Sequence, residues 1–150
     1  MNTKNIESDF KFVGQQITKL NLENDFVSLS DRNTKNEFDV FYEIDEITKH
    51  DDKIWGTINL TVLCKITDTE ETEDSSPLKC NISLTINGCF IDSANVSIDK
   101  FKEMLGLNGC TALYSIARGI ITGISAQSML EGNITLPLIN IFKLVKSTEK

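Results

Sequence analysis

Three segments of the chain alternate apolar and polar residues with a period of two, and this alternation constrains the fold more than any other feature. The segments are EFDVFYEID (37–45), IWGTINLTVLCKI (54–66) and LKCNISLTINGCF (78–90). Successive side chains of a β-strand point to opposite faces of a sheet, so each segment predicts a strand with one dry face and one wet face. The predicted dry face carries Phe38, Val40, Tyr42 and Ile44, then Ile58, Leu60, Val62, Cys64 and Ile66, then Leu78, Cys80, Ile82, Leu84 and Ile86.

A further strand is expected at 10–22, although its alternation changes phase along the segment. Its apolar residues are Phe10, Phe12, Val13, Ile17, Leu20 and Leu22. Val13 and Ile17 lie on the parity opposite to that of the other four. Because one inserted residue moves every later side chain to the other face, a β-bulge near Gly14 would reconcile them.

The connections between these strands favour an antiparallel sheet. Residues 48–53 form a short polar turn and residues 68–77 a charged loop, and both are too short for a parallel crossover. The connection at 23–36 is longer and carries Phe26, Val27 and Leu29 among polar residues. Long loops with embedded apolar residues are often binding loops or cross a sheet edge.

The pattern becomes helical after residue 92. Ser97 can cap a short helix at 98–105 that Gly106 closes. A second helix is expected within 110–130, where apolar residues recur at helical spacing. This stripe consists of Leu113, Ile116, Ala117, Ile120, Ile121 and Ile124. Pro137 interrupts the apolar stretch that follows, which predicts an extended piece and then a last short helix.

Segment 110–130 has only one charged residue, Arg118, and its length would reach across a bilayer. Arg118 would then lie near the middle of the membrane, at a cost of about 2.5–3.5 kcal/mol, and several Ser, Thr and Gln residues weaken this alternative further. We therefore expect the helix to cover the dry face of the sheet and not to insert into a membrane. The predicted fold is α+β, a four-stranded antiparallel sheet with helices packed on one face, in a single domain of 150 residues.

The other side of this helix has few charges. It carries Tyr114, Arg118, Thr122 and Ser125, while Gly119 and Gly123 allow a neighbouring backbone to come close. A face that meets only solvent would carry more Lys and Glu. Either the chain's own terminus or another subunit is therefore expected to cover it. Arg118, Gly119, Thr122 and Gly123 are the candidates for an oligomer interface.

Composition excludes some partners and indicates a compartment. The net charge of −7 argues against nucleic-acid binding, which needs clustered Lys and Arg. The N-terminal Lys residues precede no apolar run, so no signal peptide is expected. The four cysteines show no CxxC spacing and are expected to be buried thiols, which indicates a reduced, cytoplasmic protein.

No set of residues indicates catalysis, a metal or a cofactor. His50 is the only histidine and lies in a polar turn. A Ser–His–Asp or Cys–His arrangement would have to use this residue. The chain contains neither GxxxxGK[ST] nor GxGxxG, and the acidic run at 70–74 lacks the ligand pattern of an EF-hand. We expect a protein that is not an enzyme.

The order of elements, with a few identities, resembles the SecB family of export chaperones. The identities are NGCF at 87–90, Ala117-Arg118 and Ile121 in the helix, and Leu136-Pro137 before the last apolar turn. The resemblance covers residues from about 10 to 144. It rests on pattern more than on one signature motif.

The resemblance implies a non-enzymatic, ATP-independent holdase that binds unfolded polypeptides, including preproteins for export. Members of the family are homotetramers, built as dimers of dimers. Their clients bind in apolar grooves lined by the loop after the first strand, the second strand and the main helix. At the matching positions, the client-binding candidates are Phe26, Val27, Leu29, Phe41, Tyr42, Tyr114, Ile124 and Met129.

The resemblance also implies a motor partner, the ATPase SecA, which SecB chaperones dock through acidic residues on the flat sheet surface. Glu23 falls on one of these positions, whereas Lys19 and Ser83 stand where acidic residues are expected. SecA docking in the usual manner is thus supported at one position and opposed at two. The alternative is a dedicated chaperone or adaptor for one partner, such as the antitoxin of a toxin–antitoxin pair.

Overall fold

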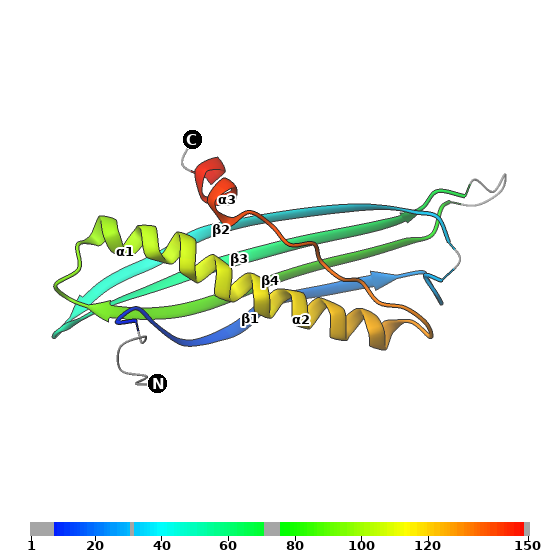
Figure 1. Cartoon of the computed structure of the whole chain (residues 1–150). Helices are drawn as coiled ribbons and strands as arrows, with labels where there is room; N and C mark the ends of the chain where they lie inside the picture. Colours follow the sequence, from blue (N-terminus) through cyan, green and yellow to red (C-terminus); the bar gives the residue numbers. More distant parts are fainter. Residues whose placement is uncertain (1–7, 31, 71–75, 149–150) are drawn as a thin grey trace, which may run out of the picture.

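The computed structural model of the chain describes residues 8–30, 32–70 and 76–148. Within these residues, one antiparallel sheet has the strand order β1-β4-β3-β2, and helices lie on one of its faces (Figure 1). The strands are β1 (Lys11–Asn24), β2 (Thr34–His50), β3 (Lys53–Asp68) and β4 (Lys79–Ser93). The helices are α1 (Ile98–Met104), the π-helix η2 (Leu105–Gly109), α2 (Cys110–Ser128) and α3 (Ile141–Thr148). The predicted fold class is confirmed.

The core lies between the helices and the two central strands, β3 and β4. Every second residue of both strands is buried, from Ile54 to Asp68 and from Cys80 to Asp92. The strands pair so that Leu60 is opposite Ile86 and Val62 is opposite Leu84. The apolar parity predicted for these segments therefore points to the helices, and we call this side the inner face.

Strand β1 contains the bulge that its phase change predicted. Its register with β4 shifts between Phe12 and Gly14, and a second, unexpected shift lies between Ile17 and Lys19. Phe12 before the two shifts, Ile17 between them and Leu20 after them are all paired with inner-face residues of β4. The bulges thus place apolar residues of both parities on one face.

The two edge strands, β1 and β2, are joined by a crossover loop, described at residues 25–30 and 32–33, that passes the end of the sheet (Figure 1). β2 is longer than predicted and has its own register shift between Ile44 and Glu46. It continues to His50, so the turn to β3 is shorter than the predicted 48–53. Asp51 forms this turn with φ 55°, a left-handed conformation that Asp tolerates.

The prediction that Gly106 ends the first helix is wrong. Ser97 does cap α1, since its Oγ accepts a hydrogen bond from the Lys100 amide at 3.2 Å. The helix then continues through η2 into α2. The buried residues Leu105 and Cys110 are five positions apart, one more than an α-helical face allows, and a π-turn absorbs such an extra residue.

Helix α2 is rotated relative to the predicted stripe. It buries Leu113, Ala117 and Ile121 as expected, but Ile116, Ile120 and Ile124 are only half-buried. Tyr114 and Ser125, expected on the opposite side, are buried. The periodicity alone could not show this rotation, because the C-terminal segment packs against the Tyr114 side of the helix.

That C-terminal segment, residues 132–140, is an extended strap, as predicted, and α3 follows it. Gly132 adopts φ 89° where the chain turns back from α2. The Tyr114 hydroxyl donates to the Pro137 carbonyl, Arg118 Nε donates to the Leu136 carbonyl at 3.1 Å, and the Ile134 amide donates to Ser125 Oγ at 2.7 Å. This side of α2 was expected to be covered either by the chain's own terminus or by another subunit. In the structure, the C-terminal strap covers it.

We expect Gly56→Ala to destabilise the protein, because α1 and η2 lie directly over this glycine of β3. A Cβ at Gly56 would lie 2.6 Å from Phe101 Cε1 and 2.8 Å from Leu105 Cδ1, both in fully buried side chains. Overpacking of this kind costs about 1–3 kcal/mol. Urea unfolding would measure it. The matched variant Gly14→Ala, where nothing lies within 4 Å of the added Cβ, should be neutral or slightly stabilising, and equal losses in both would contradict the packing.

Candidate functional site

The crossover loop is held at its start by Asn24. Asn24 Nδ2 donates to the Phe26 carbonyl at 2.8 Å and to the Ser128 carbonyl at 3.2 Å, while its Oδ1 accepts from the Phe26 amide at 3.0 Å. The loop also pairs with the residues that follow α2, since the Leu130 amide donates to the Val27 carbonyl at 2.8 Å. The loop and the end of α2 therefore form one surface.

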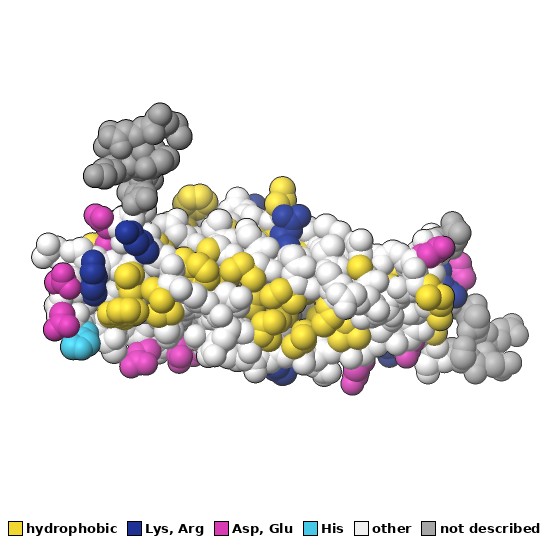
Figure 2. All heavy atoms as spheres, turned by 90° about the horizontal axis from the view of Figure 1, so that it is seen from below, with side chains coloured by type: hydrophobic (Ala, Val, Ile, Leu, Met, Phe, Trp, Pro, Cys, Tyr) yellow, Lys and Arg dark blue, Asp and Glu magenta, His cyan; other side chains and the backbone are white. Residues whose placement is uncertain are grey.

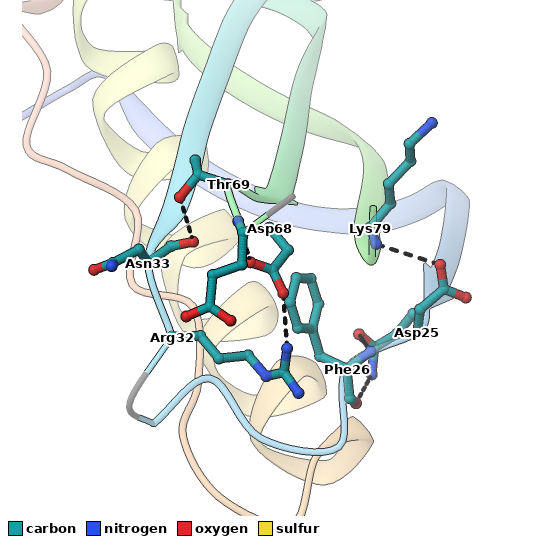
Figure 3. Close-up of polar contacts among 9 residues, drawn as sticks. Asp25, Phe26, Arg32, Asn33, Asp68, Thr69 and Lys79 are labelled. Atoms are coloured by element: carbon teal, nitrogen blue, oxygen red, sulfur yellow. Dashed lines mark hydrogen bonds and ion pairs between the residues drawn. The ribbon is translucent and has the colours of Figure 1, made fainter. Parts of the chain in front are cut away.

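At its other end the loop is tied to the tip of β3 (Figure 3). Arg32 Nη1 lies 2.7 Å from Asp68 Oδ2, and Asp68 Oδ1 accepts from the Glu70 amide at 2.9 Å. The hydrogen bond from the Glu70 amide is the main reason why the pKa of Asp68 is lowered. Burial opposes this effect, and Arg32 lowers the pKa further. The loop is thus closed by an ion pair in which the Asp68 side chain is only 6% exposed.

We expect the Asp68 ion pair to stabilise the fold at neutral pH and to lose this effect in acid. A carboxyl group whose pKa is lowered on folding stabilises above its ordinary value, here 3.8, and the effect fades as the pH falls below that value. Asp68→Asn should therefore lower the urea midpoint at about pH 7 and at about pH 5, and the difference from the native protein should shrink below 3.8. A difference that stays constant into acid would contradict the assignment.

The sequence-predicted groove residues are distributed between the surface and the core. Val27 is 64% exposed, Leu29 is half-buried, and Phe26 and Met129 are buried. Leu130, which the sequence reading missed, is 84% exposed next to Val27. The structure thus brings Val27, Leu29 and Leu130 together as an accessible apolar surface, which we call the loop patch.

The other predicted residues lie elsewhere. Tyr114 is buried under the strap, and Ile124 is half-buried on α2. Tyr42 lies on the inner face near Gly106, whereas Phe41, 47% exposed, is on the opposite face. Adjacent residues of a strand point to opposite sides, so Phe41 and Tyr42 cannot line one groove. Phe26, Tyr114 and Met129 are closed to a client in this conformation.

A second apolar surface, the β1–α2 band, runs along the edge of the molecule (Figure 2). It consists of Phe12, Val13, Ile17 and Leu20 of β1, all exposed, and Ile116, Ile120 and Ile124 of α2, all half-buried. With about 3.6 residues per turn, the three isoleucines lie on the flank of α2 opposite the strap-bound Arg118 and Ser125. The bulges of β1 hid this band from the sequence reading.

The solvent-facing top of α2 is formed by small, uncharged residues. It carries Ala112, Ser115, Gly119, Gly123 and Ala126. A Cβ at Gly119 or Gly123 would meet nothing within 4 Å, so neither glycine is needed for packing inside the chain. Of the four predicted interface residues, Arg118 bonds its own strap and Thr122 is half-buried, while the two glycines remain accessible.

The outer face of the sheet, which the helices do not cover, is polar and has an uncharged centre. Asn87 Nδ2 donates to Asn59 Oδ1 at 2.8 Å, and the Thr61 and Thr85 hydroxyls are 3.0 Å apart. Exposed charged residues stand on the two edge strands and toward the ends of the central strands, at Lys53, Lys65 and Lys79. Glu23 lies on this face opposite Asn81, and Lys19 lies opposite Thr85. The predicted SecA-docking position is therefore exposed, with a lysine on the same strand.

The described residues contain no arrangement for metal binding, because no three His, Cys, Asp or Glu side chains among them could share an ion. His50 Nδ1 lies 3.7 Å from Asp51 Oδ1, and both side chains are largely exposed. Burial raises the pKa of Cys64 and Cys110 to about 12, so these thiols are not nucleophiles at neutral pH. Within the same residues, no helix has the length and apolarity to span a membrane.

The sequence matches no protein-family model and no curated protein. Among solved structures, the SecB-like chaperone Rv1957 of Mycobacterium tuberculosis, in complex with a ChAD peptide from the Rv1956 HigA1 antitoxin, aligns with a TM-score of 0.58. The alignment covers 87% of this chain and 91% of that chain at 9% identity. This chain has the SecB-like fold. A protein of unknown function from Streptococcus agalactiae aligns with a TM-score of 0.46 at 13% identity, covering 86% of this chain and 97% of that chain.

The SecB-like fold confirms the resemblance drawn from NGCF at 87–90, Ala117-Arg118, Ile121 and Leu136-Pro137. Several of these positions have a packing role. Gly88 lies under Leu113, Ala117 and Ile121 are buried on α2, and Leu136 is a buried residue of the strap. At 9% identity the likeness concerns the fold, and these contacts show why such sparse identities could indicate it.

Proposed function

We propose that the protein is an ATP-independent chaperone that holds non-native polypeptides. The observation that carries this proposal is the loop patch, in which Val27 and Leu130 are exposed although the loop itself is fixed by Asn24, Arg32 and Asp68. Exposed apolar residues that lie side by side in one patch are typical of an interaction site. The SecB-like fold agrees with this function, and the proposed role needs no catalysis.

The client-binding surface is proposed to be centred on Val27, Leu29 and Leu130. Tyr42 and Ile124 are half-buried and could join it through small side-chain rearrangements. Phe26, Tyr114 and Met129 would contribute only if the loop or the strap moved, and Phe41 would need a client that reached the outer face. Apolar surfaces that can repack suit clients of many sequences.

A dedicated chaperone for one partner is the second candidate. The specific observation in its favour is that the aligned Rv1957 structure holds a peptide from an antitoxin. Under this alternative the loop patch would bind one segment of one protein, such as an antitoxin, and would protect other unfolded chains poorly. The exposed apolar residues would be the same, so binding experiments must separate the two roles.

We propose that the assembly is a homotetramer, a dimer of dimers. The β1–α2 band and the small-residue top of α2 support this, because both are apolar or uncharged surfaces without a cover in the described chain. Gly119 and Gly123 destabilise a helix by about 0.5–1 kcal/mol each relative to alanine. Close approach of a second backbone would offset that cost.

The remaining parts of the proposal concern partners and compartment. The cytoplasm is the expected location, in keeping with four free cysteines, of which Cys64, Cys80 and Cys110 are buried. SecA stays a candidate partner because Glu23 matches an acidic docking position. Lys19 and Ser83 stand where acidic residues are expected, and they argue against this partner. Neither nucleic acid nor membrane insertion is expected of a chain with a net charge of −7.

The experiment that separates the two candidate functions uses a permanently unfolded probe. Reduced, carboxymethylated α-lactalbumin, labelled with a fluorophore, is titrated with the protein while anisotropy is measured, and folded α-lactalbumin serves as the control. A general holdase binds the unfolded form and not the folded one. If neither form binds while the protein is folded by circular dichroism, the general holdase is excluded and the dedicated chaperone is favoured.

A further inference from the structure

Helix α3 and the end of the strap before it carry apolar side chains that face solvent. Leu138 is 83% exposed and Phe142 is 66% exposed, which places them with Leu130 among the most exposed large apolar residues of the described chain. Lys143 and Lys146 lie beside Phe142 on the solvent-facing side of α3, and both are exposed. We call Leu138, Phe142, Lys143 and Lys146 the α3 surface.

The opposite side of α3 fixes the helix to the rest of the protein. Ile141 packs against the core, and Val145 lies 3.5 Å from the point that a Cβ of Gly106 would occupy. Asn140 caps the helix, because its Oδ1 accepts a hydrogen bond from the Lys143 amide at 3.1 Å. The exposure of the α3 surface is therefore that of a packed helix and not that of a loose chain end.

The α3 surface is locally basic, although the chain as a whole is acidic. Residues 132–148 contain two lysines and no Asp or Glu. The carboxylates of β2 at Glu37, Asp39 and Glu43 belong to the outer face of the sheet, whereas α3 contacts η2 on the inner side. Exposed charges more than about 8 Å apart are largely screened at physiological ionic strength. The field close to α3 is therefore set by its own lysines.

We propose that the α3 surface binds the surface of an anionic lipid bilayer. Leu138 and Phe142 contact the boundary between headgroups and acyl chains, and the two lysines contact the anionic headgroups. A lipid surface matches both features at once. A soluble anion would leave the two apolar side chains in water, and an apolar protein groove would leave the lysines without partners.

The place of α3 in the fold keeps this surface accessible in the proposed assembly. α3 contacts β2 and η2, whereas β1 forms the other edge of the sheet (Figure 1). The β1–α2 band, which we propose as a subunit interface, therefore does not cover it. Two lysines and two apolar side chains bind a bilayer weakly and reversibly, and several chains on one vesicle bind more tightly.

Vesicle sedimentation tests the proposal. The native protein is mixed with sucrose-loaded vesicles of phosphatidylcholine alone, or of phosphatidylcholine and phosphatidylglycerol in equal parts. It should bind the anionic vesicles about tenfold more tightly or better, because each lysine near an anionic surface favours binding. The preference should shrink at high salt. Equal binding to both vesicles, or sedimentation with neither, would overturn the proposal.

Two variants locate the contact. Phe142→Glu and the double variant Lys143→Gln/Lys146→Gln should each weaken binding to the anionic vesicles about tenfold. All three positions are exposed, and circular dichroism checks that the fold is kept. Leu130→Glu is the matched control, because Leu130 is equally exposed but belongs to the loop patch, and it should bind as the native protein does. Loss in Leu130→Glu with native binding by Phe142→Glu would assign the contact to the loop patch and refute the proposal.

Fluorescence shows whether residue 142 reaches the lipid. The native protein has one tryptophan, Trp55, which is paired with Ile91 on the outer face of the sheet. The Phe142→Trp variant should therefore gain a blue shift with anionic vesicles, and brominated lipids should quench it more than they quench the native protein. Equal quenching of the two proteins would contradict the proposal.

A soluble acidic polymer separates a lipid surface from an acidic protein. If polyglutamate binds the native protein, Phe142→Glu loses that binding and vesicles do not bind, the α3 surface serves an acidic polypeptide and the lipid proposal fails. These assays contain no unfolded client, so their failure leaves the proposed chaperone function untouched.

Discussion

Leu113→Ala is expected to lower the free energy of unfolding by about 2–5 kcal/mol, the range for removing a fully buried leucine. Leu113 projects from α2 onto β4, where its Cδ2 atom lies 2.7 Å from the point a Cβ of Gly88 would occupy. The glycine leaves a space that this side chain fills together with the ring of Phe90. Urea unfolding followed by circular dichroism measures the loss.

Ile116→Ala on the same helix is the matched control for this packing. Ile116 is half-buried, so the same kind of truncation should cost only about 1 kcal/mol. The two losses in free energy of unfolding, compared with each other, show which side of α2 faces the sheet. If Ile116→Ala cost more than Leu113→Ala, the helix would face the sheet with its isoleucine flank, which would contradict the packing described here.

Ile120→Glu and Ile17→Glu, each made alone, are expected to reduce the assembled protein to smaller species while the fold is kept. The two residues stand on α2 and β1 in the β1–α2 band, and a charge buried at a subunit interface without a partner costs several kcal/mol. Size-exclusion chromatography with light scattering should show the mass of four chains in the native protein and that of one or two in the variants.

Leu138→Glu is the control, because this strap residue is exposed but lies outside the β1–α2 band. It should leave the mass unchanged. Native mass in Ile17→Glu and Ile120→Glu would remove the band from the interface. A native protein that is a single chain at all concentrations would contradict the proposed tetramer itself.

Gly119→Ala is expected to act oppositely on helix stability and on assembly. In the single chain the added Cβ meets no atom within 4 Å, so alanine should stabilise α2 by about 0.5–1 kcal/mol. If a second backbone approaches Gly119, the same methyl group weakens the assembly. Added to the dissociated variant Ile120→Glu, Gly119→Ala should raise the unfolding midpoint. Added to the native protein, it should lower the mass of the assembly. The two results together would show both effects.

The fold was predictable where one physical signal dominated. β3 and β4 are buried on one face along their whole length, so their alternation gave both the strands and the face, and the phase change of β1 predicted its bulge. The boundaries of β2 and the π-turn at η2 were not predictable. They depend on the pairing with β3 and on the packing of Leu105 and Cys110 in the core, and these are contacts between residues that are distant in the sequence.

The candidate site was predicted in part. Val27 and Leu29 were recognised because apolar residues in a polar loop stand out, and both are in the loop patch. Phe26 looks the same in sequence but is buried, because Asn24 turns the backbone at that point. Phe12, Ile17 and Leu20 were taken as ordinary strand residues. That they are exposed follows from the edge position of β1, which local sequence does not reveal.

Light scattering of a chemically unfolded test protein, diluted into buffer without ATP, would measure the proposed chaperone activity itself. We expect this protein, at near-stoichiometric amounts, to suppress the rise in scattering. A Val27→Asp/Leu130→Asp variant of the loop patch should suppress it less, whereas Leu138→Glu should act as the native protein does. Scattering that rises equally with and without the native protein, while circular dichroism shows it folded, would contradict the account.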